Sequence, residues 1–140
     1  MFGCKKVFLI FTTLMVSLSC QIGEAKVSDP EYVYKIMSSD EWVQQSDREV
    51  YSGNDWDKQD GFIHLSTANQ VEKTAKKYYK DVANPILLKL CYEDIAKDIK
   101  WEENSKGELF PHAYHEIRRD AFVKVIPISL NDFDFSSLDF

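Results

Sequence analysis

The chain has 140 residues, of which 44% are hydrophobic and 29% charged, and its formal net charge is −6. This length suits about one domain, and the composition is ordinary for a folded soluble protein. The acidic balance argues against nucleic acid as a partner, because binding to phosphates needs clustered lysine and arginine.

The first 25 residues have the layout of a secretory signal peptide. Two lysines precede an apolar run, Val7 to Leu18, which is too short to span a bilayer because a spanning helix needs about 20 apolar residues. Small residues favour cleavage after Ala25, which predicts an exported protein, periplasmic or secreted, with no membrane span in residues 26–140. Lipidation at Cys20 and an uncleaved membrane anchor are the alternatives.

Cleavage at this point changes the charge and the cysteine content of the chain. It removes two of the 17 basic residues and one of the 23 acidic residues, so the mature net charge becomes −7. Cys4 and Cys20 would leave with the signal peptide. Cys91 lies in an apolar segment, so we expect a buried, unpaired thiol there rather than a nucleophile.

The first elements predicted after the signal are a strand, a short helix, a loop and a second strand. Segment 32–37 is β-branched and aromatic, as strands are. Ser38 and Glu41 have the spacing of a capping box, which opens a short helix. The polar segment 47–59 predicts an irregular loop, and GFIHLS, residues 61–66, is the second strand.

A longer helix and a central strand follow. Thr67 opens the helix, because Gln70 completes a second capping box and apolar side chains then recur at helical spacing. The Asn-Pro pair at 84–85 ends it. Segment 86–92 is the most apolar of the chain and predicts a central strand.

The remaining segments complete an α+β pattern. We expect a helical turn at 93–98, strands at 99–103 and 121–128, and a turn at 104–108, and we leave the acidic, aromatic tail unassigned. Strands separated by few, short helices predict a small, bent, mostly antiparallel sheet with two short helices. Residues 26–140 then form one globular domain with its core at about 32–130.

An ionisable side chain, His64, interrupts the apolar second strand. Ser66 and Thr67 follow at the predicted helix N-terminus, where hydroxyls and free backbone amides can bind an anion or a hydroxyl group. His64 is therefore a candidate cleft residue. The plainer alternative is a half-buried histidine bonded to a backbone carbonyl, with Ser66 and Thr67 acting only as caps.

The other two histidines lie in FPHAYHEI, residues 110–117. His112 and His115 are three apart with Tyr114 between them, and the proline of this segment favours a structured loop or a strand edge. Three histidines can hold a catalytic zinc ion, so a zinc hydrolase on His64, His112 and His115 is a third functional hypothesis. Without an HExxH motif or a cysteine partner, we assign no metal ligand.

Several segments together resemble a bacterial family known as domain of unknown function 952: YSGNDWDKQDGFIHLSTANQ, ILLKL, IKWEE and LFPHAYHEI. The resemblance spans residues 34–127. It implies the ADP-ribosyltransferase-like fold, with which that family is grouped, and an uncharacterised activity. HLS at 64–66 also resembles a strand of RNA 2′-phosphotransferases, whose histidine helps to hold NAD.

This resemblance implies residue roles. His64 would contact the adenosine-side ribose of NAD, Ser66 and Thr67 would lie near the phosphates or the nicotinamide end, and Tyr114 would stack on the nicotinamide ring. The candidate catalytic residues are then His64, His112 and Tyr114. Ser66 and Thr67 are candidate substrate-binding residues, and His64, Ser66 and Tyr114 would bind NAD, which would be a substrate rather than a resident cofactor.

The sequence also departs from these families. The motif does not select the glutamate of classical ADP-ribosyltransferases, and Glu102, Glu103 and Glu116 stay open. The arginines that bind phosphates in the RNA enzymes have no counterparts, and free NAD is scarce outside a cytoplasm. Two main functions therefore stay open: an ADP-ribosyltransferase-like domain with a cleft for a nucleotide-like ligand, and a non-catalytic module that binds a small ligand or an envelope partner. The oligomeric state is not determined.

Both the nucleotide-binding and the zinc hypotheses require His64 and His112 to line one cleft. We expect their side chains to lie within about 10 Å of each other, a width that suits a small-molecule pocket. Phe110 should be buried, while His112 and Tyr114 face His64 across a partly solvated gap. Histidines on opposite faces of the sheet would return His64 to the core.

Overall fold

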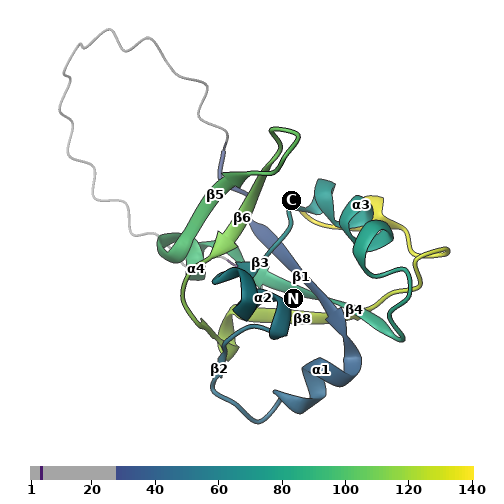
Figure 1. Ribbon diagram of the computed structural model, residues 1–140, viewed down its shortest axis with the longest axis horizontal. Coiled ribbons are helices and arrows are strands. Elements are labelled where there is room, and N and C mark those ends of the chain that lie inside the picture. The colour runs from purple at the N-terminus through teal and green to yellow at the C-terminus, as the bar shows by residue number, and fades with distance from the viewer. Residues whose placement is uncertain (1–3, 5–27) are drawn as a thin grey trace, which may run out of the picture.

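The most apolar segment of the chain forms strand β4 (Pro85–Cys91), as predicted, at the centre of a three-stranded sheet of order β1-β4-β8. The computed structural model describes Cys4 and residues 28–140. Strands β1 (Tyr32–Ser38) and β8 (Phe122–Pro127) both run antiparallel to β4. Figure 1 shows β1 crossing the middle of the molecule, with β4 and β8 beside it.

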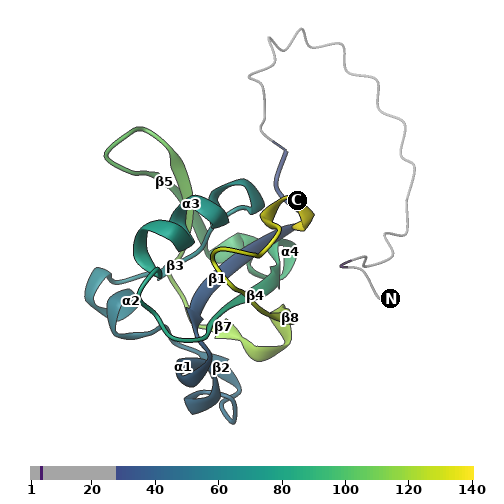
Figure 2. The ribbon, with the colours of Figure 1, turned by 90° about the vertical axis from the view of Figure 1, so that its right-hand side faces the viewer.

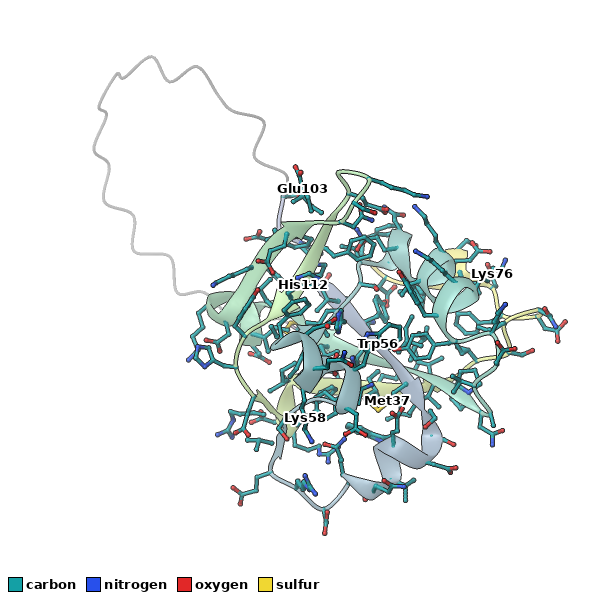
Figure 3. All side chains as sticks on the ribbon, in the orientation of Figure 1. Met37, Trp56, Lys58, Lys76, Glu103 and His112 are labelled. Carbon is teal, nitrogen blue, oxygen red and sulfur yellow. A yellow bond between two sulfur atoms is a disulfide. The ribbon has the colours of Figure 1, made fainter. Side chains whose placement is uncertain are left out.

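Alternate residues of β1 point into two separate hydrophobic cores, because successive side chains of a strand face opposite sides. Val33 and Met37 are fully buried in one core, and Tyr34 and Ile36 belong to the other. In Figure 3 Met37 lies inside the molecule, while charged side chains project from its surface. Both faces of this sheet are therefore covered.

The remaining strands of the described residues form two smaller antiparallel sheets. One pairs β2 (Val50–Tyr51) with β7 (Ile117–Arg118), and the other has the order β3-β6-β5. Its strands are β3 (Ile63–His64), β6 (Leu109–Ala113) and β5 (Ile99–Glu103). The FPHA segment is thus the central strand of this sheet.

The helices of the described residues are short, and three of the four α-helices among them begin at a capping box. The structure describes α1 (Ser39–Gln44), α2 (Asp55–Asp60), α3 (Ala68–Tyr78) and α4 (Tyr92–Ile95), with single 3₁₀ turns at Ala96–Asp98, Arg119–Ala121 and Phe135–Ser137. The boxes predicted at Ser38 and Thr67 are confirmed. The loop predicted at 47–59 is wrong in part, because Asn54 and Asp57 form a third box that opens α2.

The prediction of an α+β fold with antiparallel strands and few short helices is confirmed. The strands form three sheets in the described part of the chain, rather than one bent sheet. Figure 2 shows α2 and α3 on the same side of β1 and β4.

The C-terminal tail, which the sequence left unassigned, packs against α3 (Figure 1). Leu138 is buried in the same core as the apolar face of α3. The hydroxyl of Tyr34 donates a hydrogen bond of 2.9 Å to the carbonyl oxygen of Asp139, whose side chain also pairs with Lys89. These contacts fix the tail on the sheet.

The prediction of an unpaired Cys91 applies to the cleaved chain, whereas the structure describes a chain that retains Cys4. Cys91 is buried, as expected, but it forms a disulfide with Cys4, with their Cα atoms 6.0 Å apart. Apart from Cys4, the predicted signal peptide lies outside the described residues, including cleavage after Ala25 and the lipidation alternative at Cys20. Among the described residues, none of the helices has the length and apolar character needed to cross a membrane.

A glycine just before α2 is required by both its backbone and its neighbour. Gly53 has φ +92°, and a Cβ atom added there would lie 2.8 Å from Cβ of Asp57. Gly107 has a similar φ of +75°, but a Cβ would meet nothing within 4 Å. The pair therefore separates backbone strain from a steric clash.

We predict that Gly53→Ala lowers the free energy of unfolding by about 1–3 kcal/mol more than Gly107→Ala does. Both variants place alanine in the left-handed region, but only the first would press against the buried side chain of Asp57. Urea unfolding of the two variants and the native chain measures the difference. Equal losses would show that the backbone conformation alone requires glycine at position 53.

Candidate functional site

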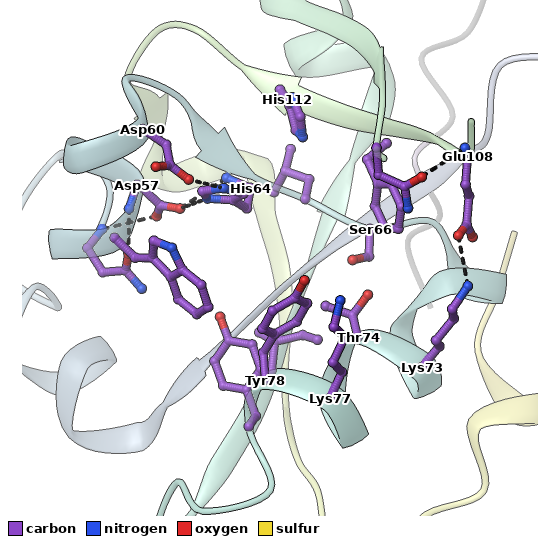
Figure 4. Close-up of a pocket in the computed structure, with 17 residues that line it drawn as sticks. Asp57, Asp60, His64, Ser66, Lys73, Thr74, Lys77, Tyr78, Glu108 and His112 are labelled. Atoms are coloured by element: carbon purple, nitrogen blue, oxygen red, sulfur yellow. Dashed lines mark hydrogen bonds and ion pairs between the residues drawn. The ribbon is translucent and has the colours of Figure 1, made fainter. Parts of the chain in front are cut away.

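A cavity of about 270 Å³ lies between α2, α3 and the β3-β6-β5 sheet (Figure 4). Aromatic and apolar side chains make up part of its wall. Polar side chains from α2, β3, α3, β6 and two adjoining loops complete it; among them are Asp57, Asp60, His64, Ser66, Lys73, Thr74, Lys77, Glu108 and His112. The cavity therefore joins segments that are far apart in the sequence.

The two predicted histidines meet in this cavity. The antiparallel register of β3 and β6 places His64 directly opposite His112, so their side chains lie on the same face of the sheet. Their ring centroids are 5.7 Å apart. The expectation that both histidines line one cleft is confirmed.

The ring of His64 contacts a buried carboxylate, that of Asp57. Oδ1 of Asp57 lies 2.7 Å from Nδ1 of His64 and accepts a second hydrogen bond, of 3.0 Å, from the His64 backbone amide. The same carboxylate binds the ammonium group of Lys35 at 2.7 and 2.8 Å. Lys35 and Asp57 are each only 2% exposed, so this is a buried ion pair.

The remaining contacts of Asp57 come from the turn before α2 and from β2. Its Oδ2 accepts hydrogen bonds from the backbone amide of Asn54 at 3.1 Å and from the hydroxyl of Tyr51 at 3.2 Å. Burial alone would raise the pKa of Asp57. The hydrogen bonds from His64 and the charge of Lys35 outweigh burial and hold this pKa well below its ordinary value.

The second nitrogen of His64 also faces a carboxylate. Nε2 lies 3.0 Å from Oδ2 of Asp60, which is partly exposed at the end of α2. Only the doubly protonated ring can donate to both Asp57 and Asp60. The plainer alternative, a histidine bonded to a backbone carbonyl, does not describe His64, because its ring partners are two carboxylates.

His112 has a carboxylate partner of its own. Nδ1 of His112 lies 2.8 Å from Oε2 of Glu102, which also accepts a 2.7 Å hydrogen bond from the hydroxyl of Tyr114. These bonds, the one from His112 first, lower the pKa of Glu102. Of the three glutamates left open by the sequence, Glu102 is the one that contacts a candidate residue; Glu103 and Glu116 are exposed.

The cavity has an aromatic wall that the sequence analysis missed. The rings of Trp56 and Tyr78 meet edge to face with centroids 5.3 Å apart, and each side chain is 46% exposed. The centroid of Trp56 is 6.1 Å from that of His64. Half-exposed aromatic rings beside a cavity offer a planar ligand a stacking surface.

The other predicted site residues are divided between the cavity and its surroundings. Ser66 is buried and lines the cavity, whereas Thr67 caps α3 and Tyr114 is on the surface, and neither lines it. Phe110 was expected to be buried, but it is half-buried and lines the cavity. The reason is the strand period, because Pro111 faces the core and its neighbours in β6 face the cavity.

The third histidine does not join the first two. His115 is exposed and does not line the cavity. Within Cys4 and residues 28–140, no group of three or more His, Cys, Asp or Glu side chains is arranged to hold a metal ion. The zinc-hydrolase hypothesis therefore has no site among these residues.

Two of the site residues that the sequence analysis missed carried a signal in the sequence. Lys35 is a lone charge between Val33 and Met37, on the inward face of an apolar strand, which requires a buried partner. Asp57 follows Asn54 at capping-box spacing. Neither pattern shows that the two side chains pair with each other.

Comparisons with known proteins identify relatives of the chain. Residues 36–125 match the family described as "Protein of unknown function (DUF952)", which confirms the resemblance drawn from the sequence. The crystal structure of protein CC0527 from Caulobacter crescentus is similar with a TM-score of 0.66 and 34% identity, covering 70% of this chain and 86% of that one. The solution structure of CC0527 gives a TM-score of 0.63 and 33% identity, covering 71% and 85%. No curated protein matches the chain.

We predict that the chain loses stability as the pH falls below about 4, partly through Asp57. Because the pKa of Asp57 is lower in the folded state, the unfolded state takes up this proton first as the pH falls, at a cost of up to about 1.4 kcal/mol per pH unit. Urea unfolding at a series of pH values from 7 to 2 measures this slope.

A double variant tests this prediction by removing both charges of the buried pair of Lys35 and Asp57. In Lys35→Met with Asp57→Asn neither buried charge remains, so the acid slope should be shallower than in the native chain. Asp55→Asn, on the exposed side of α2, controls for the loss of one carboxylate. An unchanged slope in the double variant would show that Asp57 does not contribute to acid unfolding.

Proposed function

Since the chain belongs to the DUF952 family of proteins of unknown function, we propose that its cavity binds a nucleotide-like ligand. One observation carries this proposal. A single cavity combines two imidazole rings, an aromatic wall and lysine side chains. These are the groups that recognise ribose hydroxyls, a planar base and phosphate, respectively.

Each part of such a ligand has a counterpart in the wall. The faces of Trp56 and Tyr78 offer stacking to a base, which contributes about 1–3 kcal/mol for a base on an aromatic side chain. Nδ1 of His112 is engaged by Glu102, and its Nε2 makes no hydrogen bond within the described residues, so this nitrogen is available to a ribose hydroxyl. The hydroxyl group of Ser66 lines the same space.

The size of the cavity limits how much of a ligand it encloses. Its volume of about 270 Å³ is just below the roughly 300–1,000 Å³ of small-molecule pockets. A mononucleotide suits this volume better than a dinucleotide. NAD would therefore bind with one mononucleotide half inside the cavity and the other half extending over the rim.

Whether the bound ligand reacts depends on the groups that reach it. In an ADP-ribosyltransferase-like domain a glutamate stabilises the ribose as the glycosidic bond breaks, and Glu102 is our candidate because it contacts His112. Glu102 does not line the cavity, however, and both carboxylates beside His64 are already bound to its ring. This observation favours the second candidate function, a non-catalytic nucleotide-binding module.

We predict that a nucleotide ligand stabilises the chain against heat, and that Trp56→Ala abolishes this stabilisation. At a hundredfold excess over its Kd, a ligand adds about 2.7 kcal/mol to the stability of the folded state. Thermal unfolding with adenosine, AMP, ADP-ribose and NAD measures the shift. Trp56 is half-exposed, so its loss should affect the base-stacking wall more than the core.

His115→Ala is the matched control, because it removes an exposed aromatic side chain outside the cavity. It should keep the full ligand-induced shift. No shift with any of the four compounds would contradict the proposed function. A shift that survives in Trp56→Ala would place the ligand elsewhere on the chain.

A nicotinamide-release assay distinguishes the two candidate functions. Release of nicotinamide from NAD, lost in Glu102→Gln with NAD binding retained, would identify a transferase or a glycohydrolase. Binding without nicotinamide release, in the presence and absence of acceptor compounds, would identify the binding module.

A further inference from the structure

We infer that the α3 wall of the cavity, formed by Lys73, Thr74 and Lys77, is a subsite for a phosphate monoester. This inference rests on the proposed function and adds an orientation for the ligand. The three residues are spaced i, i+1 and i+4, so Lys73 and Lys77 lie one turn apart on the same face of α3. Figure 4 shows them rising from α3 toward Ser66 and Glu108.

The charges around the cavity leave one lysine without a carboxylate. Asp57 pairs with Lys35 and His64, and Asp60 also pairs with His64. Glu108 pairs with Lys73 at 3.0 Å. The ammonium group of Lys77 pairs with no carboxylate in the described part of the chain.

The contact that the structure does give Lys77 is with an aromatic ring. Its ammonium group lies 4.6 Å from the centroid of Tyr78, a ring that belongs to the stacking wall. A ligand whose base lies against Trp56 and Tyr78 would therefore have this positive charge close to it. Lys77 therefore gives the α3 wall a positive charge that no carboxylate of the described cavity lining balances.

The hydroxyl groups near Lys77 add hydrogen-bond donors. Thr74 is half-buried and lies beside Lys77 in Figure 4, and Ser66 is 4% exposed on the opposite wall. A terminal phosphate has three acceptor oxygens, whereas a ligand carboxylate has two. The phosphate therefore better matches three donors, the ammonium group of Lys77 and the hydroxyls of Thr74 and Ser66. Donor number therefore favours a phosphate monoester as the anion.

The other end of the cavity fixes the direction of the ligand. Asp57 and Asp60 lie around His64, away from Lys73 and Glu108 (Figure 4). The lysine at that end, Lys35, is buried and bound to Asp57, so that end offers no unpaired lysine to a phosphate. The phosphate therefore points to α3, and the ribose hydroxyls point to the histidines.

We predict that the native chain binds AMP about tenfold more tightly than adenosine, as expected for charge-assisted hydrogen bonds at a partly exposed site. Lys77→Gln should remove most of this difference and leave the affinity for adenosine unchanged. Isothermal titration calorimetry of each protein with each compound gives the four affinities. The preference for AMP should also decrease as salt is added.

Lys76→Gln is the matched control. Lys76 is adjacent in sequence, lies outside this cavity and pairs with Glu72 at 2.6 Å, so this variant loses the same charge without touching the subsite. It should keep the preference for AMP. A loss of preference equal to that of Lys77→Gln would mean that only the net charge matters, which would overturn the inference.

The remaining outcomes separate this inference from the proposed function. Equal binding of AMP and adenosine by the native chain would overturn the phosphate subsite and leave the nucleotide cavity standing. Lys77→Gln weakening both compounds alike would do the same. If neither compound binds, the proposed function fails, and the subsite fails with it.

Discussion

The rest of the structure depends on the contacts of one buried carboxylate, that of Asp57. It binds the side chain of Lys35 from β1, the hydroxyl of Tyr51 from β2 and both the ring and the amide of His64 from β3. Removing two charges from water costs several kcal/mol for each ion, and only well-formed hydrogen bonds offset that cost. Since the partners come from three strands, they must all be in place before Asp57 is satisfied. The buried pair therefore fixes the position of α2 relative to three strands.

The same carboxylate links the stability of the fold to the geometry of the cavity. Asp57 holds Nδ1 of His64, so the orientation of this ring is set by a group whose other partners lie in the core. His112 has a similar but more exposed arrangement with Glu102. A substitution at His64 would disturb folding and binding together. Trp56 and Lys77 contribute to the cavity wall from the surface, so their effects on binding can be measured separately.

The relatives of the chain support its fold but do not indicate its activity. CC0527 from Caulobacter crescentus shares 34% identity over 70% of this chain, and the family to which this chain belongs is described without a function. A shared fold does not determine a reaction, because function depends on the groups in the site. Two imidazoles, two aromatic rings and an unbalanced lysine around one cavity of limited volume underlie the proposal of a nucleotide-like ligand.

The sequence by itself determined several of the local elements and indicated that His64 and His112 share a cleft. Strands β1 and β4, the capping boxes at Ser38 and Thr67, and the family resemblance all follow from patterns within a few residues, where the backbone period and the caps are set. Only the tertiary structure showed that Lys35 binds Asp57, 22 residues away, and that α3 supplies lysines to the same cavity as β6. A lone lysine in a strand predicts that a partner exists but does not identify it. Its identity depends on strand register and on helix orientation, which are fixed by contacts between segments distant in the chain.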